Sequence, residues 1–164
     1  MLQKKNKNKG ILFWITGLPG SGKTNIAIKI KNKIQSIYGP TLLVNGDDLR
    51  RIFQLKKYDK KNRIKYSKMF CKYAKFITDQ KINLIFAIVG MMDEPRNWNR
   101  KNIKNYLEVY IKSDIKKIIR KNKKKLYKNQ KKNLVGLDIK PDFPKKPDII
   151  IINNFKKNII ELST

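Results

Sequence analysis

Residues 11–24 read ILFWITGLPGSGKT, and this stretch decides the fold class of the 164-residue chain. The first six residues, Ile11–Thr16, are an apolar run typical of a buried strand. The next eight, Gly17–Thr24, match the pattern G-x-x-x-x-G-K-[ST] between a strand and a helix. In such a loop the backbone N–H groups curl around phosphate oxygens, and the helix N-terminus favours negative charge. The sequence therefore predicts that Gly17–Thr24 binds a nucleoside triphosphate.

Each position of this loop has an expected role. The predicted ATP-binding residues are Gly17, Leu18, Pro19, Gly20, Ser21, Gly22, Lys23 and Thr24. We expect the Lys23 ammonium to reach the β- and γ-phosphates, which makes Lys23 a predicted catalytic residue as well. The Thr24 hydroxyl is predicted to ligate Mg²⁺. The expected cofactors are therefore Mg²⁺ and ATP, the latter as phosphoryl donor.

Apolar runs and helical patterns alternate along the rest of the chain. The predicted strands are Ile11–Thr16, Thr41–Asn45, Ile82–Val89, Tyr106–Lys112 and Asp148–Ile152. The predicted helices cover about 22–38, 60–80, 99–105 and 114–121. We expect Ile82–Val89 to be the central strand, because it is apolar on both faces. This pattern predicts an α/β protein with the P-loop NTPase fold, in which a parallel sheet of about five strands carries helices on both faces.

The length and the absence of linkers predict a single P-loop domain over residues 1–164, with a basic tail at 1–10 and a mobile lid at about 122–146. Lysine and arginine number 40 against 12 acidic residues, a formal net charge of +28. The basic residues are mostly lysines spread over the whole chain, whereas nucleic-acid binding favours a patch on one face with arginine forks. A nucleic-acid partner is therefore not expected, although the charge would attract phosphorylated small molecules.

Several functional classes are excluded by composition. The chain has no histidine, which excludes an imidazole base and disfavours a zinc site, and its single Cys71 excludes an intramolecular disulfide. The apolar stretch Ile82–Met92 is too short to span a bilayer as a helix. Met1–Lys9 lacks the apolar core of a secretion signal. We expect a cytoplasmic protein without a membrane partner, and the role of Cys71 stays open.

An acidic pair follows the second predicted strand, in the segment Asn45-Gly-Asp-Asp-Leu-Arg50. A carboxylate at the carboxyl end of a neighbouring strand points toward the crevice that holds the phosphate loop. Asp47 is therefore predicted to help bind Mg²⁺ and to accept a proton from an attacking hydroxyl, although either aspartate would also serve as a helix N-cap. Arg50, one helical turn after Asp47, is expected to clamp an anionic group of the acceptor. No guanine-reading N-K-x-D segment is present, which disfavours a GTPase.

With these segments in view, the chain resembles the adenylyl-sulfate kinase family in order along almost its whole length. Besides the phosphate loop and Asn45–Arg50, the resemblance rests on Tyr58–Arg63, on EVYI at 108–111, on KKLY at 124–127 and on LVGLD at 134–138. It implies a phosphotransferase that uses Mg-ATP to phosphorylate the 3′-hydroxyl of adenosine 5′-phosphosulfate, giving PAPS and ADP in sulfate assimilation.

The resemblance also implies roles for individual residues. Asp47 would activate the acceptor hydroxyl, and Arg50 and Arg63 would hold the phosphate-linked end of the acceptor. Tyr58 stands where the family has a phenylalanine that stacks on the acceptor base. Lys124 would come from the lid and contact phosphate. The implied partner is a small-molecule nucleotide acceptor, and because the family is commonly dimeric a homodimer is compatible with the sequence.

This chain departs from the family pattern on the acceptor side. Leu134 replaces a second stacking phenylalanine, so one aromatic face worth about 1–3 kcal/mol is lost from a site that Leu134 is still expected to line. Asn45 replaces the first carboxylate of the D-G-D motif, and Tyr66 replaces an asparagine. The I-S-P segment after the third strand has no counterpart in Ile88–Met92, and the lid is several residues shorter than usual.

The nature of the acceptor therefore stays open. Residues 92–100 and 106–110 resemble a divergent branch found with surface-polysaccharide genes, which includes kinases acting on the 3′-hydroxyl of cytidine diphosphoramidate. Adenylyl sulfate is the default acceptor, and cytidine diphosphoramidate is the alternative within the same reaction class. A basic nucleic-acid-binding module with a degenerate ATP site is the alternative from a different class, and it predicts binding with a steep salt dependence.

Overall fold

The computed structural model describes residues 9–121 and 132–155. The elements in chain order are β1 (Leu12–Gly17), α1 (Lys23–Tyr38), β2 (Thr41–Asn45), α2 (Gly46–Ile52), α3 (Lys60–Asp79), β3 (Asn83–Ala87), α4 (Asp93–Asn102), β4 (Tyr106–Lys112), α5 (Ile115–Lys121) and β5 (Ile149–Ile152). The five strands form one sheet in the order β2-β3-β1-β4-β5, and every neighbouring pair is parallel. The predicted α/β class with a five-stranded parallel sheet is confirmed.

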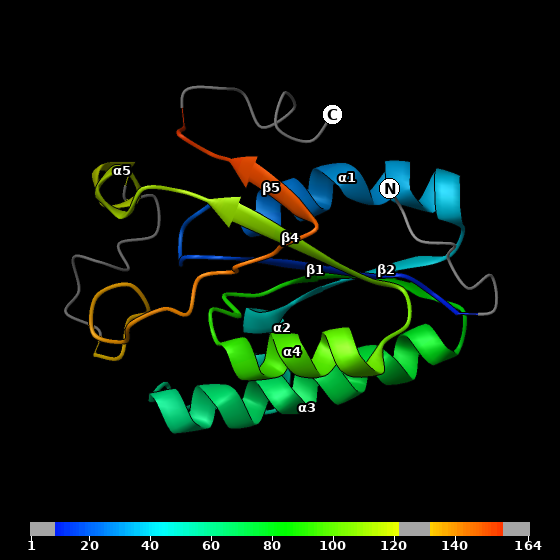
Figure 1. The fold of residues 1–164 in the computed structure, drawn as a ribbon, viewed down its shortest axis with the longest axis horizontal. Helices are drawn as coiled ribbons and strands as arrows, with labels where there is room; N and C mark the ends of the chain where they lie inside the picture. The colour runs from blue at the N-terminus through cyan, green and yellow to red at the C-terminus, as the bar shows by residue number, and fades with distance from the viewer. Residues whose placement is uncertain (1–8, 122–131, 156–164) are drawn as a thin grey trace.

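Helices cover both faces of this sheet, with α1 on one side and α3 and α4 on the other (Figure 1). Successive side chains of a strand point to opposite faces, so neighbouring residues of β1 enter different cores. Trp14 packs with Phe70 of α3 and with Phe86, whereas Ile15 packs with Ile26 of α1 and with Val109. Burial of large apolar side chains on both faces stabilises the sheet at about 25 cal/mol per Å² of apolar surface removed from water.

The middle of the sheet is β1, which pairs with β3 along one edge and with β4 along the other. The strand predicted at Ile82–Val89 is an interior strand, as its apolar character on both faces requires, but it lies one place away from the middle and ends at Ala87. The carboxyl ends of β1 and β3 consequently lie side by side. This arrangement puts the phosphate loop at the centre of the sheet edge where ligands of such folds bind.

The helix predicted at about 99–105 is wrong at both ends, because α4 runs from Asp93 to Asn102. Asp93 and Glu94 lie in its first turn, where carboxylates interact favourably with the helix dipole. Pro95 is tolerated there because N–H groups in the first turn of a helix have no acceptor within the helix, so the missing N–H of proline removes no hydrogen bond. At the other end, Ile103 adopts extended geometry and leads into β4.

The helices α2 and α3 carry residues of the predicted active site, with Asp47 and Arg50 in α2 and Arg63 in α3. α2 begins directly after β2, so its acidic first turn lies at the carboxyl edge of the sheet. α3 begins after Asp59, whose carboxylate accepts hydrogen bonds from the backbone N–H of Asn62 at 3.0 Å and from the Asn62 side chain at 2.7 Å. These bonds lower the pKa of Asp59. The predicted helix over 60–80 is thus confirmed, with a capped start.

Part of the predicted lid and of the basic tail lies outside the described residues, namely 122–131 and 1–8. Of the remaining lid, residues 132–146, the structure describes an isolated parallel bridge between Val135 and Ile139. In the described ranges no helix combines the length and the apolar character that crossing a membrane requires.

Gly10, just before β1, supplies a stability prediction. A Cβ atom at this position would lie 2.0 Å from the backbone oxygen of Ile82, and the Gly10 N–H donates to Thr78 O at 2.7 Å. Because backbone atoms cannot yield to that overlap, Gly10→Ala should lower the free energy of unfolding by about 3 kcal/mol in urea titrations. The neighbouring Lys9→Ala variant removes only an exposed ion pair to Asp79 and should cost at most about 1 kcal/mol. Equal effects of the two substitutions would contradict the close approach.

Candidate active site

The phosphate loop Gly17–Thr24 connects the end of β1 to the first turn of α1. Lys23 is only 8% exposed, and its Nζ donates to Leu18 O at 2.7 Å and to Ser21 Oγ at 3.5 Å. Its ammonium therefore lies inside the loop. The first turn of α1 contains no acidic residue, so its N-terminal positive potential is not neutralised locally. These features suit a bound polyphosphate.

Two contacts from distant segments hold this loop in place. Thr16 Oγ1 donates to Val89 O at 2.6 Å, which ties the end of β1 to the segment after β3. The buried Asn153 side chain donates through Nδ2 to Ser21 O at 3.0 Å. Sequence reasoning missed Asn153. Its only signal was a polar residue directly after an apolar strand, which is too common to single out.

The two aspartates that follow β2, Asp47 and Asp48, have different surroundings. Asp48 accepts from Asn45 Nδ2 at 3.0 Å and forms an ion pair with Arg51 at 3.1 Å. Asp47 is exposed and lines a cavity of about 490 Å³ together with Arg50 and Tyr58. The structure therefore engages Asp48 in local contacts within α2, whereas Asp47 faces a space that is large enough for part of a nucleotide.

Beside this cavity lie the three residues that are predicted to bind the acceptor, namely Arg50, Tyr58 and Arg63. The guanidinium carbon of Arg50 lies 4.0 Å from the ring centroid of Tyr58, and that of Arg63 lies 5.3 Å from the same ring. Burial, and then the charge of Arg50, lower the pKa of Arg63, while the negative charge of Asp47 acts in the opposite direction. Asp47, Arg50, Arg63 and Tyr58 therefore form one electrostatically connected group, and their roles toward an acceptor stay predictions.

Arg63 links the segment that contains Leu134 to the same region. Arg63 Nη2 donates to the backbone oxygen of Asn133 at 3.0 Å, and the neighbouring Leu134 N–H donates to Asp138 Oδ2 at 2.8 Å. Two residues later, a Cβ on Gly136 would meet the Leu18 side chain at 3.1 Å, so this segment also packs on the phosphate loop. The segment 133–136 thus contacts both Arg63 and the phosphate loop. Lys124, predicted to contact phosphate, lies outside the described residues.

A buried arginine that sequence reasoning missed organises the loop after β3. Arg96 is 3% exposed and donates to Gly90 O at 2.9 Å and to Asp142 O at 2.7 Å, and it is also paired with Asp93. Its Nε lies 3.3 Å from Oε1 of the buried Glu108. One guanidinium therefore joins the start of α4, β4 and the described part of the predicted lid. Sequence alone could not identify Arg96 among forty basic residues.

Gly90, in the same loop, occupies a closely packed position with a positive φ. Gly90 has a φ of +48°, and a Cβ there would lie 3.0 Å from Thr16 Oγ1 and 3.2 Å from Trp14 Nε1. Gly90 therefore lets the backbone approach the end of β1 where a serine side chain would not fit without rearrangement.

Cys71 has a structural role. Its side chain is completely buried, and its thiol donates to Pro95 O at 3.5 Å, which links α3 to α4. Burial raises the pKa of Cys71 to about 12, so the thiol is neutral at physiological pH and is a poor nucleophile.

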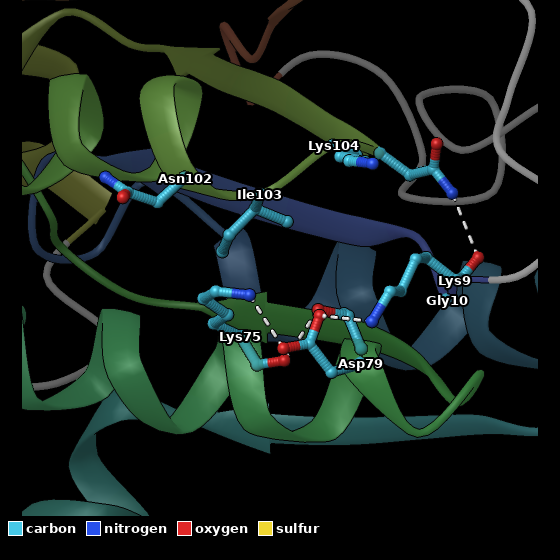
Figure 2. Close-up of a pocket in the computed structure, with 9 residues that line it drawn as sticks. Lys9, Gly10, Lys75, Asp79, Asn102, Ile103 and Lys104 are labelled. Carbon is cyan, nitrogen blue, oxygen red and sulfur yellow. Dashed lines mark hydrogen bonds and ion pairs between the residues drawn. The ribbon is translucent and has the colours of Figure 1, made fainter.

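A second cavity, of about 240 Å³, lies at the opposite edge of the sheet and is not part of this site. Figure 2 shows Lys9 and Lys75 converging on Asp79, at 3.1 Å and 2.7 Å respectively. The cavity is bordered by Gly10 before β1 and Asn105 before β4, so it lies at the amino ends of the strands. Ligands of parallel α/β sheets bind at the carboxyl ends, where Gly17–Thr24 and Asp47 are found.

With this geometry established, comparison with known proteins identifies the family. A family model described as adenylylsulphate kinase matches residues 9–152. The chain belongs to the adenylylsulphate kinase family. It is therefore a kinase, an enzyme that uses ATP to phosphorylate a hydroxyl group on a small-molecule nucleotide, and the predicted family, fold and enzyme class are confirmed.

Individual relatives differ in what they act on. The chain is 36% identical over 159 residues to a cytidine diphosphoramidate kinase of Campylobacter jejuni, covering 94% of this chain and 93% of that protein. It is 31% identical over 157 residues to an adenylyl-sulfate kinase of Clostridium acetobutylicum, covering 91% and 78% respectively. Its fold matches an APS kinase of Mycobacterium tuberculosis, solved with AMPPNP and APS, with a TM-score of 0.82, 23% identity and 94% of each chain covered.

The buried charge network yields a second prediction. Replacing Glu108 by glutamine would leave the cation of Arg96 buried with less compensation, because Glu108 also accepts from Arg100 at 3.0 Å and from the Tyr106 hydroxyl at 3.3 Å. Glu108→Gln should therefore lower the free energy of unfolding by about 3 kcal/mol in urea titrations. The matched Glu94→Gln variant loses only an exposed ion pair to Lys68 and should change stability by at most about 1 kcal/mol. A Glu108→Gln effect as small as that of Glu94→Gln would contradict the role of the network.

Proposed function

We propose that this kinase transfers the γ-phosphoryl group of Mg-ATP to the ribose 3′-hydroxyl of cytidine diphosphoramidate. The observation that carries the choice of acceptor is the end-to-end correspondence with the Campylobacter jejuni cytidine diphosphoramidate kinase, which covers 93% of that relative at 36% identity. Adenylyl sulfate is the second candidate, favoured by the family model and by the relative from Clostridium acetobutylicum.

The lining of the acceptor cavity supports the smaller base. Tyr58 is 46% exposed at the cavity and offers one aromatic face, whereas the apolar residue that lines the cavity beside it, Leu55, has no ring to offer a second. Stacking of one base face contributes about 1–3 kcal/mol, and a purine gains more from a second face than a pyrimidine does because its surface is larger. A site with one aromatic and one aliphatic partner therefore loses less by accepting cytosine.

The donor half of the site fits Mg-ATP. Lys23, inside the loop, would neutralise the β- and γ-phosphates, and the N–H groups at the start of α1 would bind their oxygens. The Thr24 hydroxyl and the Asp47 carboxylate are oxygen donors of the kind that Mg²⁺ prefers, and Mg²⁺ usually takes only one or two protein ligands in addition to phosphates. When bound, Mg²⁺ would neutralise charge that develops on the transferred group.

The transfer itself needs little covalent chemistry from the protein. The 3′-oxygen of the acceptor attacks the γ-phosphorus, the bond from γ-phosphorus to the bridging β-oxygen breaks, and ADP leaves with that electron pair. Asp47 accepts the proton of the attacking hydroxyl. Arg50 and Arg63 bind the anionic end of the acceptor and hold the hydroxyl in line. Positioning and charge neutralisation account for most of the rate enhancement in such reactions.

The choice of acceptor is tested by direct competition. Release of ADP by the purified protein with Mg-ATP should be at least tenfold more efficient, as kcat/KM, with cytidine diphosphoramidate than with adenylyl sulfate. Lys23→Ala should nearly abolish turnover of both, because the β- and γ-phosphates lose their cation. Equal or higher efficiency with adenylyl sulfate would assign the protein to the second candidate, and absence of turnover with both would overturn the proposed function.

The role of Asp47 gives a separate prediction, because its neighbour Asp48 is a natural control. Asp47→Asn should lower kcat about 10²- to 10⁴-fold, since the general base is lost, while the Kd of Mg-ATP measured by calorimetry changes by a few-fold at most. Asp48→Asn should leave kcat within a few-fold of wild type, since Asp48 is engaged with Asn45 and Arg51. If Asp47→Asn instead abolished ATP binding, Asp47 would be mainly a metal ligand.

A further inference from the structure

The guanidinium of Arg50 lies between two tyrosine rings. Its Cζ atom is 4.0 Å from the ring centroid of Tyr58 and 5.1 Å from that of Tyr66. Its Nη2 also donates to the backbone oxygen of Lys57. Three groups from outside α2 therefore constrain one long side chain that would otherwise sample many rotamers, each at a cost in conformational entropy when a ligand binds.

The two rings have different positions relative to the cavity. Tyr58 lines the cavity, is exposed and also faces Arg63, so it can touch a bound nucleotide. Tyr66 is only partly exposed, packs against the core cluster that contains Phe70 and Phe86, and is not among the cavity-lining residues. Tyr66 therefore does not line the acceptor cavity itself but contacts Arg50, which does.

A second ring at this place has an electrostatic reason. The positive charge of Arg50 is one of the causes that lower the pKa of the neighbouring Arg63, which means that the two cations repel each other. The negative face of an aromatic ring attracts a guanidinium. The rings of Tyr58 and Tyr66 therefore attract Arg50 and hold it in position beside Arg63 despite this repulsion.

Arg50 also has one hydrogen-bond donor, Nε, that is not used within the described residues. Its Nε is buried and has no hydrogen-bond partner within the described part of the chain. A buried N–H without a partner is unfavourable, and an anionic oxygen is the partner that would satisfy it best. The side chain is thus held in place by the two rings and by Lys57 O, with its guanidinium at the wall of the cavity.

We propose that Tyr66 is a positioning residue for the acceptor, which acts by holding Arg50 against its ring so that the guanidinium is pre-organised to bind the anionic end of the nucleotide. This inference rests on the proposed function, because it assigns to Arg50 the binding of the acceptor. Tyr66 itself does not contact the reacting atoms. Its contribution is to reduce the ordering that acceptor binding would otherwise require.

Two substitutions at position 66 separate the ring from its packing. Tyr66→Leu keeps an apolar side chain against the core but removes the aromatic face, and it should raise the KM of the acceptor about three- to tenfold. The KM of ATP and kcat should stay within twofold of wild type, because the donor half of the site is untouched. Tyr66→Phe keeps the ring and should restore the wild-type acceptor KM. Tyr73→Leu, on the same helix and against the same core cluster, is the matched control and should leave the acceptor KM unchanged.

A double-substitution cycle then tests whether Tyr66 acts through Arg50. In an Arg50→Ala background, which has its own raised acceptor KM, adding Tyr66→Leu should raise the KM by less than twofold further. A full three- to tenfold increase in that background would overturn the proposal, since Tyr66 would be acting by another route. A parallel rise in the ATP KM, or a wild-type acceptor KM in Tyr66→Leu, would overturn it as well.

Failure of this inference and failure of the proposed function give different results. If the wild-type protein turns over neither cytidine diphosphoramidate nor adenylyl sulfate, the proposed function fails and the role of Tyr66 fails with it. If the wild-type protein is active and Tyr66→Leu is kinetically indistinguishable from it, only the role of Tyr66 is wrong.

Discussion

The burial of β1 on both faces and its pairing on both edges is the constraint on which the rest of the site depends. Leu12, Trp14 and Ile15 have no exposed surface, and the strand is hydrogen-bonded to β3 and β4 along its length. The loop that follows therefore starts from a fixed point. Contacts from Thr16 and from Asn153 fix it further, so the loop whose backbone amides would bind phosphate is held by contacts within the protein.

The donor and acceptor halves of the site are built in different ways. The donor half is main chain and one lysine, held by the sheet itself. The acceptor half depends on side chains, with Arg50 and Arg63 placed by tyrosine rings and by carbonyl oxygens. A backbone site is insensitive to substitution, whereas a site of stacked side chains changes with each residue. One family can therefore keep its donor chemistry while its members differ in the nucleotide they phosphorylate.

The net charge of +28 has less to do with function than its size suggests. Only a few cations are proposed to bind nucleotide, and each has its own position. Lys23 lies within the loop, and Arg50 and Arg63 lie beside the cavity. The most deeply buried arginine, Arg96, is surrounded by Asp93, Glu108 and two carbonyl oxygens and serves the architecture. Placement relative to carboxylates and rings, which total charge does not describe, separates these roles.

Local patterns were enough to predict the parallel α/β fold, the phosphate loop and the spacing of Asp47 and Arg50 by one helical turn, because apolar periodicity and a strand–loop–helix motif can be read within a short window of sequence. The roles expected of Tyr58 and Arg63 came from the family resemblance. Only the tertiary structure decided that β1 occupies the middle of the sheet, that Arg96 joins three segments and that Tyr66 faces Arg50. These are contacts between elements distant in the chain. A side chain's partner across such a distance is set by how the helices pack on the sheet, and no local pattern encodes that packing.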